Sequence, residues 1–357
     1  MMNKRNYFNI SDAGKGAMLF IILQNLFILV LTGAIYAGFK YGQIGSLLIT
    51  ALLEMMFVLT VFIIASTSNV HLTRATLINR KPSIKQGVLA VVLAFVCLYG
   101  FSGITNVFYY FLRMVGYVGT EADLAVNTWG GFIIEIICVC MVPAVCEELL
   151  FRGLLLNGLR RLGKWPAIIL SAIVFMLMHG NPDQTVFQLV LGIVLGLAFY
   201  NTGSLWVPMI IHFTNNFYVT ILGFITSMSG SGESEAEEVI VGSDLVVLLI
   251  SAIGIAITAS FLIYLICYFI KDNKKQVTSQ ATKEQELTIE AAASTADVVV
   301  VGQSDEIGDA QVVQMEVPDM NVKKSSRVSR FAIVCLSVSV IWLVVDWVLA
   351  FIRGMGA

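Results

Sequence analysis

Residues 130–160 read GGFIIEIICVCMVPAVCEELLFRGLLLNGLR, an apolar run that nevertheless contains Glu147, Glu148 and Arg152. Apolar residues continue on both sides of these charges, so the run predicts one long helix with Glu147 near its middle. About 20 apolar residues are enough to cross a bilayer. Ionisable groups are costly inside such a span, and they therefore indicate a functional site.

The whole chain has the composition of a membrane protein. Of its 357 residues, 57% are hydrophobic and 13% are charged, and the mean hydropathy is +0.84. Soluble domains carry about 25% charged residues, so lipid is the expected solvent of this chain. A net charge of -2 provides no excess of basic residues, and we therefore expect no nucleic-acid partner.

Nine apolar runs predict membrane spans. They lie near residues 17–39, 44–66, 87–112, 130–146, 166–179, 186–200, 205–226, 245–270 and 331–352. The fifth and sixth are short for a span of ~20 residues and are expected to pack inside the bundle. The sequence thus predicts an all-α polytopic membrane helix bundle. Its eight-span core lies in residues 1–271, with the motifs at 130–226, and an appended ninth span lies in residues 331–357.

Charge in the loops predicts the orientation. Basic residues gather before the first span and in alternate loops after it, whereas the loop at 227–243 carries four glutamates. Loops rich in Lys and Arg stay in the cytoplasm, so we expect a multi-pass protein of the cell membrane with a cytoplasmic N-terminus. Residues 272–330 are polar and lack a sustained apolar face, which predicts a disordered cytoplasmic linker.

The two glutamates of the long helix, Glu147 and Glu148, have different expected roles. Glu148 and Arg152 are four residues apart, so they share a helix face and can form an ion pair. Glu147 points about 100° away from Glu148 and is left free for a proton or a metal. The alternative reading is that both glutamates only mark the end of the fourth span.

His179 is predicted to lie at the depth of Glu147. The turn between their helices is expected around Gly163 and Pro166, which are stop and start signals. Each residue then lies a little over ~20 Å from the turn, at ~1.5 Å per helical residue. In the seventh span, His212 and Asn216 are one turn apart and share a face. This shared face predicts a functional pair; the alternative is that His212 and Asn216 only form polar contacts that hold helices together.

This set of side chains suits hydrolysis by an activated water. A glutamate can act as general base, and a histidine can orient the water or share a metal with it. A second histidine and an amide can stabilise the oxyanion that forms. The other acids within spans, Glu54, Glu135 and Asp346, show no comparable pattern, and no partner for Glu54 is evident in the sequence.

Three motifs in order resemble the CPBP family of intramembrane endopeptidases. They are Glu147-Glu148-x-x-x-Arg152, Phe175-x-x-x-His179 and His212-x-x-x-Asn216. The family includes CAAX prenyl proteases of type 2 and the Abi, bacteriocin-processing and lysostaphin-resistance-like proteins. The resemblance implies that Glu147 and His179 activate water, that His212 and Asn216 form the oxyanion site, and that Glu148 and Arg152 support the site structurally.

The expected function is endoproteolysis of peptides or proteins in or at the membrane, including lipid-modified ones, with bacteriocin processing or self-immunity as candidate contexts. The sequence leaves open whether one divalent, zinc-like metal is bound; its ligands would be Glu147, His179 and His212. Two alternatives stay open. One is a proton-coupled transporter, and the other is an inactive immunity or scaffold protein.

Overall fold

The computed structural model describes residues 4–119, 126–229 and 330–355, together with the isolated positions 260, 263, 264, 267, 268 and 271. The described residues form helices and no sheet strand, so the all-α prediction is confirmed for them. The eighth expected span, at 245–270, and the linker at 272–330 lie almost wholly outside the described residues.

Seven of the described helices are long and apolar enough to cross a membrane. They are α1 (Ile10–Tyr36), α2 (Gln43–Thr67), α4 (Ile84–Met114), the helix Trp129–Leu162, the helix Pro182–Thr202 that contains α9 (Thr185–Thr202), α10 (Trp206–Ser229) and α12 (Arg330–Gly354). As expected, α8 (Lys164–Met178) is shorter, with 15 residues. The sixth span is longer than the sequence indicated, because Pro182–Thr202 has 21 residues. A short helix, α3 (Leu72–Ala75), lies in the loop after α2.

The helix Trp129–Leu162 runs without a break through both glutamates, as the sequence predicts. Its middle part, α6 (Val142–Glu148), lies between two π-helical stretches, η1 (Ile136–Met141) and η2 (Leu149–Leu156). α5 (Trp129–Glu135) precedes them, and α7 (Asn157–Leu159) with a final 3₁₀ turn follows. Single π turns inside α-helices are frequent at functional sites.

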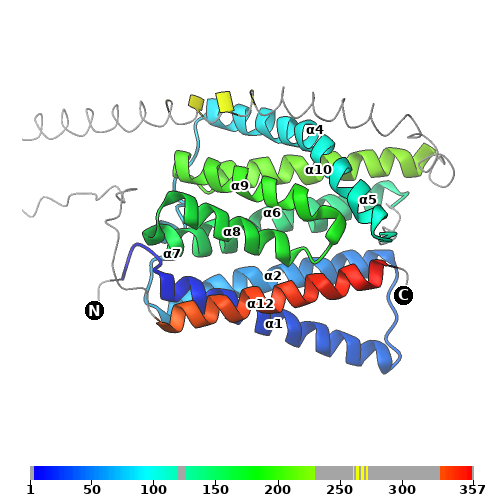
Figure 1. Cartoon of the computed structure of the whole chain (residues 1–357), viewed down its shortest axis with the longest axis horizontal. Coiled ribbons are helices and arrows are strands. Elements are labelled where there is room, and N and C mark those ends of the chain that lie inside the picture. The colour runs from blue at the N-terminus through cyan, green and yellow to red at the C-terminus, as the bar shows by residue number, and fades with distance from the viewer. Residues whose placement is uncertain are drawn as a thin grey trace, which may run out of the picture.

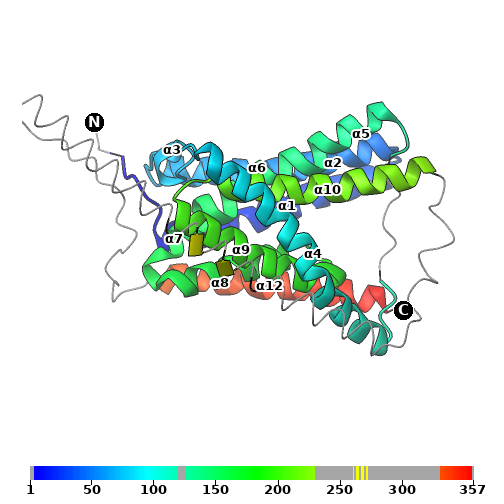
Figure 2. The same cartoon turned by 90° about the horizontal axis from the view of Figure 1, so that it is seen from above.

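The helices are stacked so that the long helix and α8 lie between two groups of helices. α9 and α10 separate them from α4 on one side, and α2, α12 and α1 lie on the other (Figure 1). Seen from above, α12 runs beside α8 (Figure 2). This order shields α6 and α8 from the lipid on several sides.

A chain of aromatic contacts joins the outer helices to the interior. Phe20 of α1 stacks on Phe57 of α2, with ring centroids 4.3 Å apart. Phe57 contacts Phe151 of η2, and Phe151 meets Phe175 of α8 edge to face. Aromatic pairs in this geometry contribute ~0.5–1.5 kcal/mol each beyond their buried area. The chain of contacts therefore fixes Phe175, one helical turn before His179.

The last helix is appended in sequence but packs into the bundle. α12 lies along α1 and also contacts α8. Cys335, Ser339 and Leu343 are buried on its inner face, while Val334, Ile341 and other large apolar residues are exposed on its outer face. This division into two faces is typical of a helix with lipid on one side and protein on the other.

Candidate active site

A buried ion pair lies at the centre of the bundle. Arg152 Nη1 donates to Glu148 Oε1 at 2.8 Å, and both side chains are fully buried. The Nδ1 of His212 donates to the same carboxylate oxygen at 3.0 Å. Glu148 thus joins the first motif to the third, and it holds the imidazole ring through one of its two nitrogens. Such a carboxylate–imidazole contact fixes the ring orientation and leaves Nε2 available.

Arg152 also ties the ion pair to α9 and α8. Its Nη2 donates to the carbonyl oxygen of Gly192 at 3.1 Å. Its guanidinium lies over the Phe175 ring, 4.5 Å from the centroid. A side chain at Gly192 would crowd α8, because an added Cβ would lie 3.1 Å from the Cα of Ala172, closer than most Cβ contacts. Glycine at this position therefore permits the close approach of α9 that brings its carbonyl to Arg152.

Glu147 is buried and keeps one oxygen unpaired. Its exposure is 7%, and Oε2 has no hydrogen-bond partner among the described residues. The ionisable groups around it include Glu54 of α2, His212, Glu148 and Arg152. A buried polar atom without a partner is unusual and calls for a functional explanation. Here it leaves a carboxylate oxygen available to a water or a substrate.

Glu54 is a neighbour of the site that the sequence did not reveal. It lies on α2, which packs against α6, and it is among the ionisable groups around Glu147. Its Oε2 is also buried without a partner among the described residues. Helical spacing relates residues within one helix or hairpin, so it provided no signal for a contact between helices so far apart in sequence.

His179 is held by its own helix. Its Nδ1 donates to the carbonyl oxygen of Phe175 at 2.8 Å, so Nε2 carries the lone pair of the neutral ring. The rings of His179 and His212 both meet the Phe175 ring edge to face, with centroids 4.8 and 5.9 Å away. The two histidines therefore contact the same phenylalanine, which brings the second and third motifs together. The pairing of His179 with Glu147 stays a prediction.

Asn216 is fixed at the proline of the long helix. Pro143 has no N–H to donate to the carbonyl of Val139, four residues earlier. Asn216 Nδ2 donates to that oxygen at 3.1 Å. The buried Asn215, which the sequence did not single out, donates from its Nδ2 to Asn216 Oδ1 at 3.3 Å. These two bonds set the orientation of the Asn216 amide and leave its second N–H for another acceptor.

The residues do not fit a metal centre in this arrangement. Among the described parts of the chain, no group of three or more His, Cys, Asp and Glu side chains could hold a metal ion. The Nδ1 bonds of His212 and His179 leave Nε2 of both rings free, so these bonds do not themselves exclude a metal. Because the described side chains of Glu147, His179 and His212 are not grouped as a ligand set, we derive no chemical step through a metal.

Comparison with known proteins points to the same segment. Residues 129–218 match the family model described as "Type II CAAX prenyl endopeptidase Rce1-like". The chain is also similar to a Bacillus subtilis (strain 168) protein named "Putative membrane peptidase YdiL", with 21% identity over 145 residues. That alignment covers 40% of this chain and 59% of the relative, which is less than two thirds of the relative's length.

No solved structure matches the chain. The family match begins at the start of α5 and ends within α10, so it contains all three motifs and the side chains that they bring together. Over residues 129–218, the chain is thus similar to the type II CAAX prenyl endopeptidases of the CPBP family.

Proposed function

We propose that this protein is an intramembrane endopeptidase that hydrolyses peptide bonds of membrane-associated or lipid-modified peptides and proteins. The observation that carries the proposal is the unpaired, buried Oε2 of Glu147, in the helix whose neighbouring residue Glu148 holds His212. The family match over residues 129–218 supports the same reaction class. The name of that family, CAAX prenyl endopeptidase, makes lipid-modified substrates one candidate class.

In the proposed reaction, Glu147 is the general base. Its carboxylate takes a proton from a water molecule that His179 orients through Nε2, and the water oxygen attacks the scissile carbonyl carbon. General-base catalysis by a positioned side chain contributes about 10²–10⁴-fold to a rate. The proton then passes from Glu147 to the leaving amine as the tetrahedral intermediate collapses. The C–N bond breaks in this step, and the products are a new carboxylic acid and a new amine, which become a carboxylate and an ammonium group when the acid proton passes to the amine.

Asn216 and His212 are proposed to face the developing oxyanion, His212 as an imidazolium that donates from Nε2 while its Nδ1 donates to Glu148. The second N–H of the Asn216 amide is the donor that its bonds to Val139 and Asn215 leave over. Preorganised donors of this kind are worth ~3–4 kcal/mol of transition-state stabilisation each. Glu148 is proposed to hold His212 in place through Oε1, which also accepts the bond from Arg152, so we assign these two residues a structural role.

Substrate trapping tests this function and identifies the substrate in the same experiment. Membranes containing the Glu147→Ala variant are compared with wild-type membranes by quantitative peptide proteomics. We expect intact substrates to accumulate with the variant and their two fragments to appear with the wild type. Identical peptide profiles would count against an endopeptidase and would favour the inactive immunity or scaffold alternative.

A further inference from the structure

The connection that follows His179 is held from outside the family segment. It consists of residues 180–184 and joins α8 to α9. Within it, the backbone N–H of Asp183 donates to Asn181 Oδ1 at 2.9 Å. Two further bonds come from distant parts of the chain. Tyr117 Oη donates to Asp183 Oδ2 at 3.2 Å, and Trp347 Nε1 of α12 donates to Thr185 Oγ1 at 2.8 Å.

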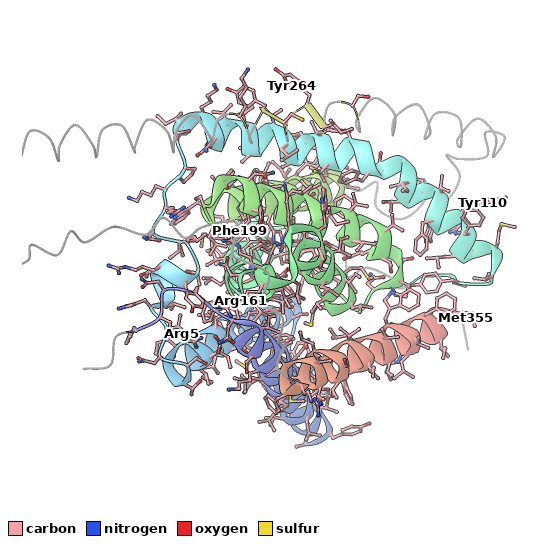
Figure 3. All side chains as sticks on the ribbon, turned by 60° about the vertical axis from the view of Figure 1, so that its left-hand side comes forward. Arg5, Tyr110, Arg161, Phe199, Tyr264 and Met355 are labelled. Carbon is pink, nitrogen blue, oxygen red and sulfur yellow. The ribbon has the colours of Figure 1, made fainter. Side chains whose placement is uncertain are left out.

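An aromatic stack links the two donors. The rings of Tyr117 and Phe351 are nearly parallel, with centroids 5.6 Å apart, and Phe351 stacks in the same way on Trp347 at 5.7 Å. The backbone N–H of Val118 also donates to the carbonyl of Gly354 at 2.7 Å. The segment after α4 and the end of α12 therefore form one unit. Tyr110 and Met355, which lie near these two ends, are found at the same end of the molecule (Figure 3).

Burial keeps the tyrosine in its donating form. Tyr117 is 1% exposed. Burial and the neighbouring Asp183 carboxylate raise the pKa of Tyr117 to about 12. The phenol therefore keeps its proton at neutral pH, and its bond to Asp183 is maintained.

α12 also contacts the helix that ends next to His179. Met178, the residue before His179, lines a small apolar cavity together with Ser339 and Leu343 of α12. Close packing transmits small shifts of one helix to its neighbour. The position of α12 is therefore coupled both to the end of α8 and to the start of α9.

We propose that Tyr117, Phe351 and Trp347 form an aromatic clamp that positions His179 for catalysis. Its two hydrogen bonds hold the connection at Asp183 and at Thr185, one residue on either side of Gln184. Tyr117, Phe351 and Trp347 lie outside residues 129–218, the segment that matches the family model. Other parts of this chain therefore restrain the connection after His179. The inference rests on the proposed function, because it assigns His179 to the reaction.

Paired substitutions test the clamp. Trp347→Phe keeps the ring stack and removes the N–H donor, and Thr185→Val removes the acceptor. A misplacement of about 1 Å can reduce a rate about 10²-fold, and one lost hydrogen bond corresponds to about tenfold. We expect each variant to lower kcat by about tenfold with KM within about twofold of wild type. The double variant should lose no more than either single one, since both remove the same bond.

The assay uses a peptide recovered by substrate trapping, resynthesised with a fluorophore and quencher and embedded in liposomes with the full-length protein. The control is Trp342→Phe, which alters an exposed tryptophan on the same helix and should leave kcat unchanged. A general loss of packing would change KM and thermal stability together with kcat. An unchanged kcat in Trp347→Phe, or additive losses in the double variant, would overturn the clamp while leaving the peptidase proposal intact.

Hydrogen–deuterium exchange provides a second measurement that needs no activity. We expect the backbone amides of residues 180–185 to exchange faster in Trp347→Phe than in wild type, and those of α10 to be unaffected. If the wild-type protein cleaves no peptide, the proposed function fails. The exchange measurement still decides whether the clamp restrains residues 180–185. Exchange that is unchanged in residues 180–185 would overturn the clamp.

Discussion

The helices that carry the motifs and the helices that surround them are stabilised in different ways. In the most apolar stretch of the motif helix Trp129–Leu162, 39% of the residues are buried, whereas 22% are buried in those of α2 and α12 and 6% in that of α1. The motif helices enclose charged and amide groups that bond to one another. The flanking helices α1, α2 and α12 present large apolar side chains such as Leu29 and Ile341 outward.

The family segment nevertheless does not make the site alone. α2 places Glu54 beside Glu147, and α12 reaches the connection after His179 through Trp347. The flanking helices thus provide more than a hydrophobic cover. Variants in matched pairs, one inside the site and one outside it, test how far this division of roles holds.

The largest difference in cleavage rate is expected between the alanine variants of two histidines. His179→Ala removes the proposed water-orienting group, so cleavage of a trapped peptide should fall about 10²–10⁴-fold. His71→Ala alters a histidine in the loop before α3 and should leave the rate within about twofold, because it lies outside the site. Initial rates in liposomes measure both. Equal activity of the two variants would remove His179 from the mechanism.

The next contrast concerns two ion pairs and is measured as the free energy of unfolding in detergent. Arg152→Leu leaves Glu148 buried with His212 as its remaining partner, and breaking a buried pair costs about 3–5 kcal/mol. Arg5→Leu breaks the pair with Asp12, in which the arginine side chain is 32% exposed, and should cost about 1 kcal/mol. Similar losses for both variants would show that the interior pair has no special structural role.

A smaller difference in kcat is expected between the leucine variants of two asparagines. Asn215→Leu removes the donor to Asn216 Oδ1, so the amide can rotate, and kcat should fall about tenfold. In α1, Asn25 donates to the carbonyl of Ile21 in its own helix. Asn25→Leu should therefore leave kcat unchanged. A normal kcat in Asn215→Leu would mean that Val139 alone orients Asn216.

The weakest effect is a dependence of stability on alkaline pH. The folded-state pKa of Tyr117, about 12, lies above its ordinary value of about 10. The protonated Tyr117 phenol therefore contributes its full stabilisation below about pH 10, and this contribution is lost as pH rises through about 12. Between these values, the melting temperature of wild type should fall relative to Tyr117→Phe, which has no proton to lose. Parallel curves would show that this phenol does not stabilise the clamp.

Much of the fold follows from hydropathy, because lipid demands long apolar helices whose backbone groups are bonded internally. The length of the helix through Glu147 and the pairing of Glu148 with Arg152 could be predicted from spacing within one helix. Hairpin geometry predicted that His179 lies at the depth of Glu147. Each of these predictions uses a distance along one helix or across one short turn.

Other features of the site depend on contacts between helices that spacing does not predict. Glu148 holds His212, and Asn216 bonds to the carbonyl that Pro143 leaves without its helical donor. The proline was visible in the sequence, but nothing in the sequence specified which side chain takes the free carbonyl. Glu54 showed no helical pattern with other polar residues, so its position beside Glu147 becomes evident only when α2 packs on α6.

The decisive experiment for the proposed mechanism compares wild type with Glu147→Gln in liposomes, using a quenched fluorescent peptide derived from a trapped substrate. Glutamine keeps the size of the side chain and cannot accept the proton of water. We predict that wild type cleaves the peptide, and that Glu147→Gln loses cleavage by at least about 10²-fold with an unchanged melting temperature. Cleavage at the wild-type rate by Glu147→Gln would contradict the assignment of Glu147 as the group that activates the water.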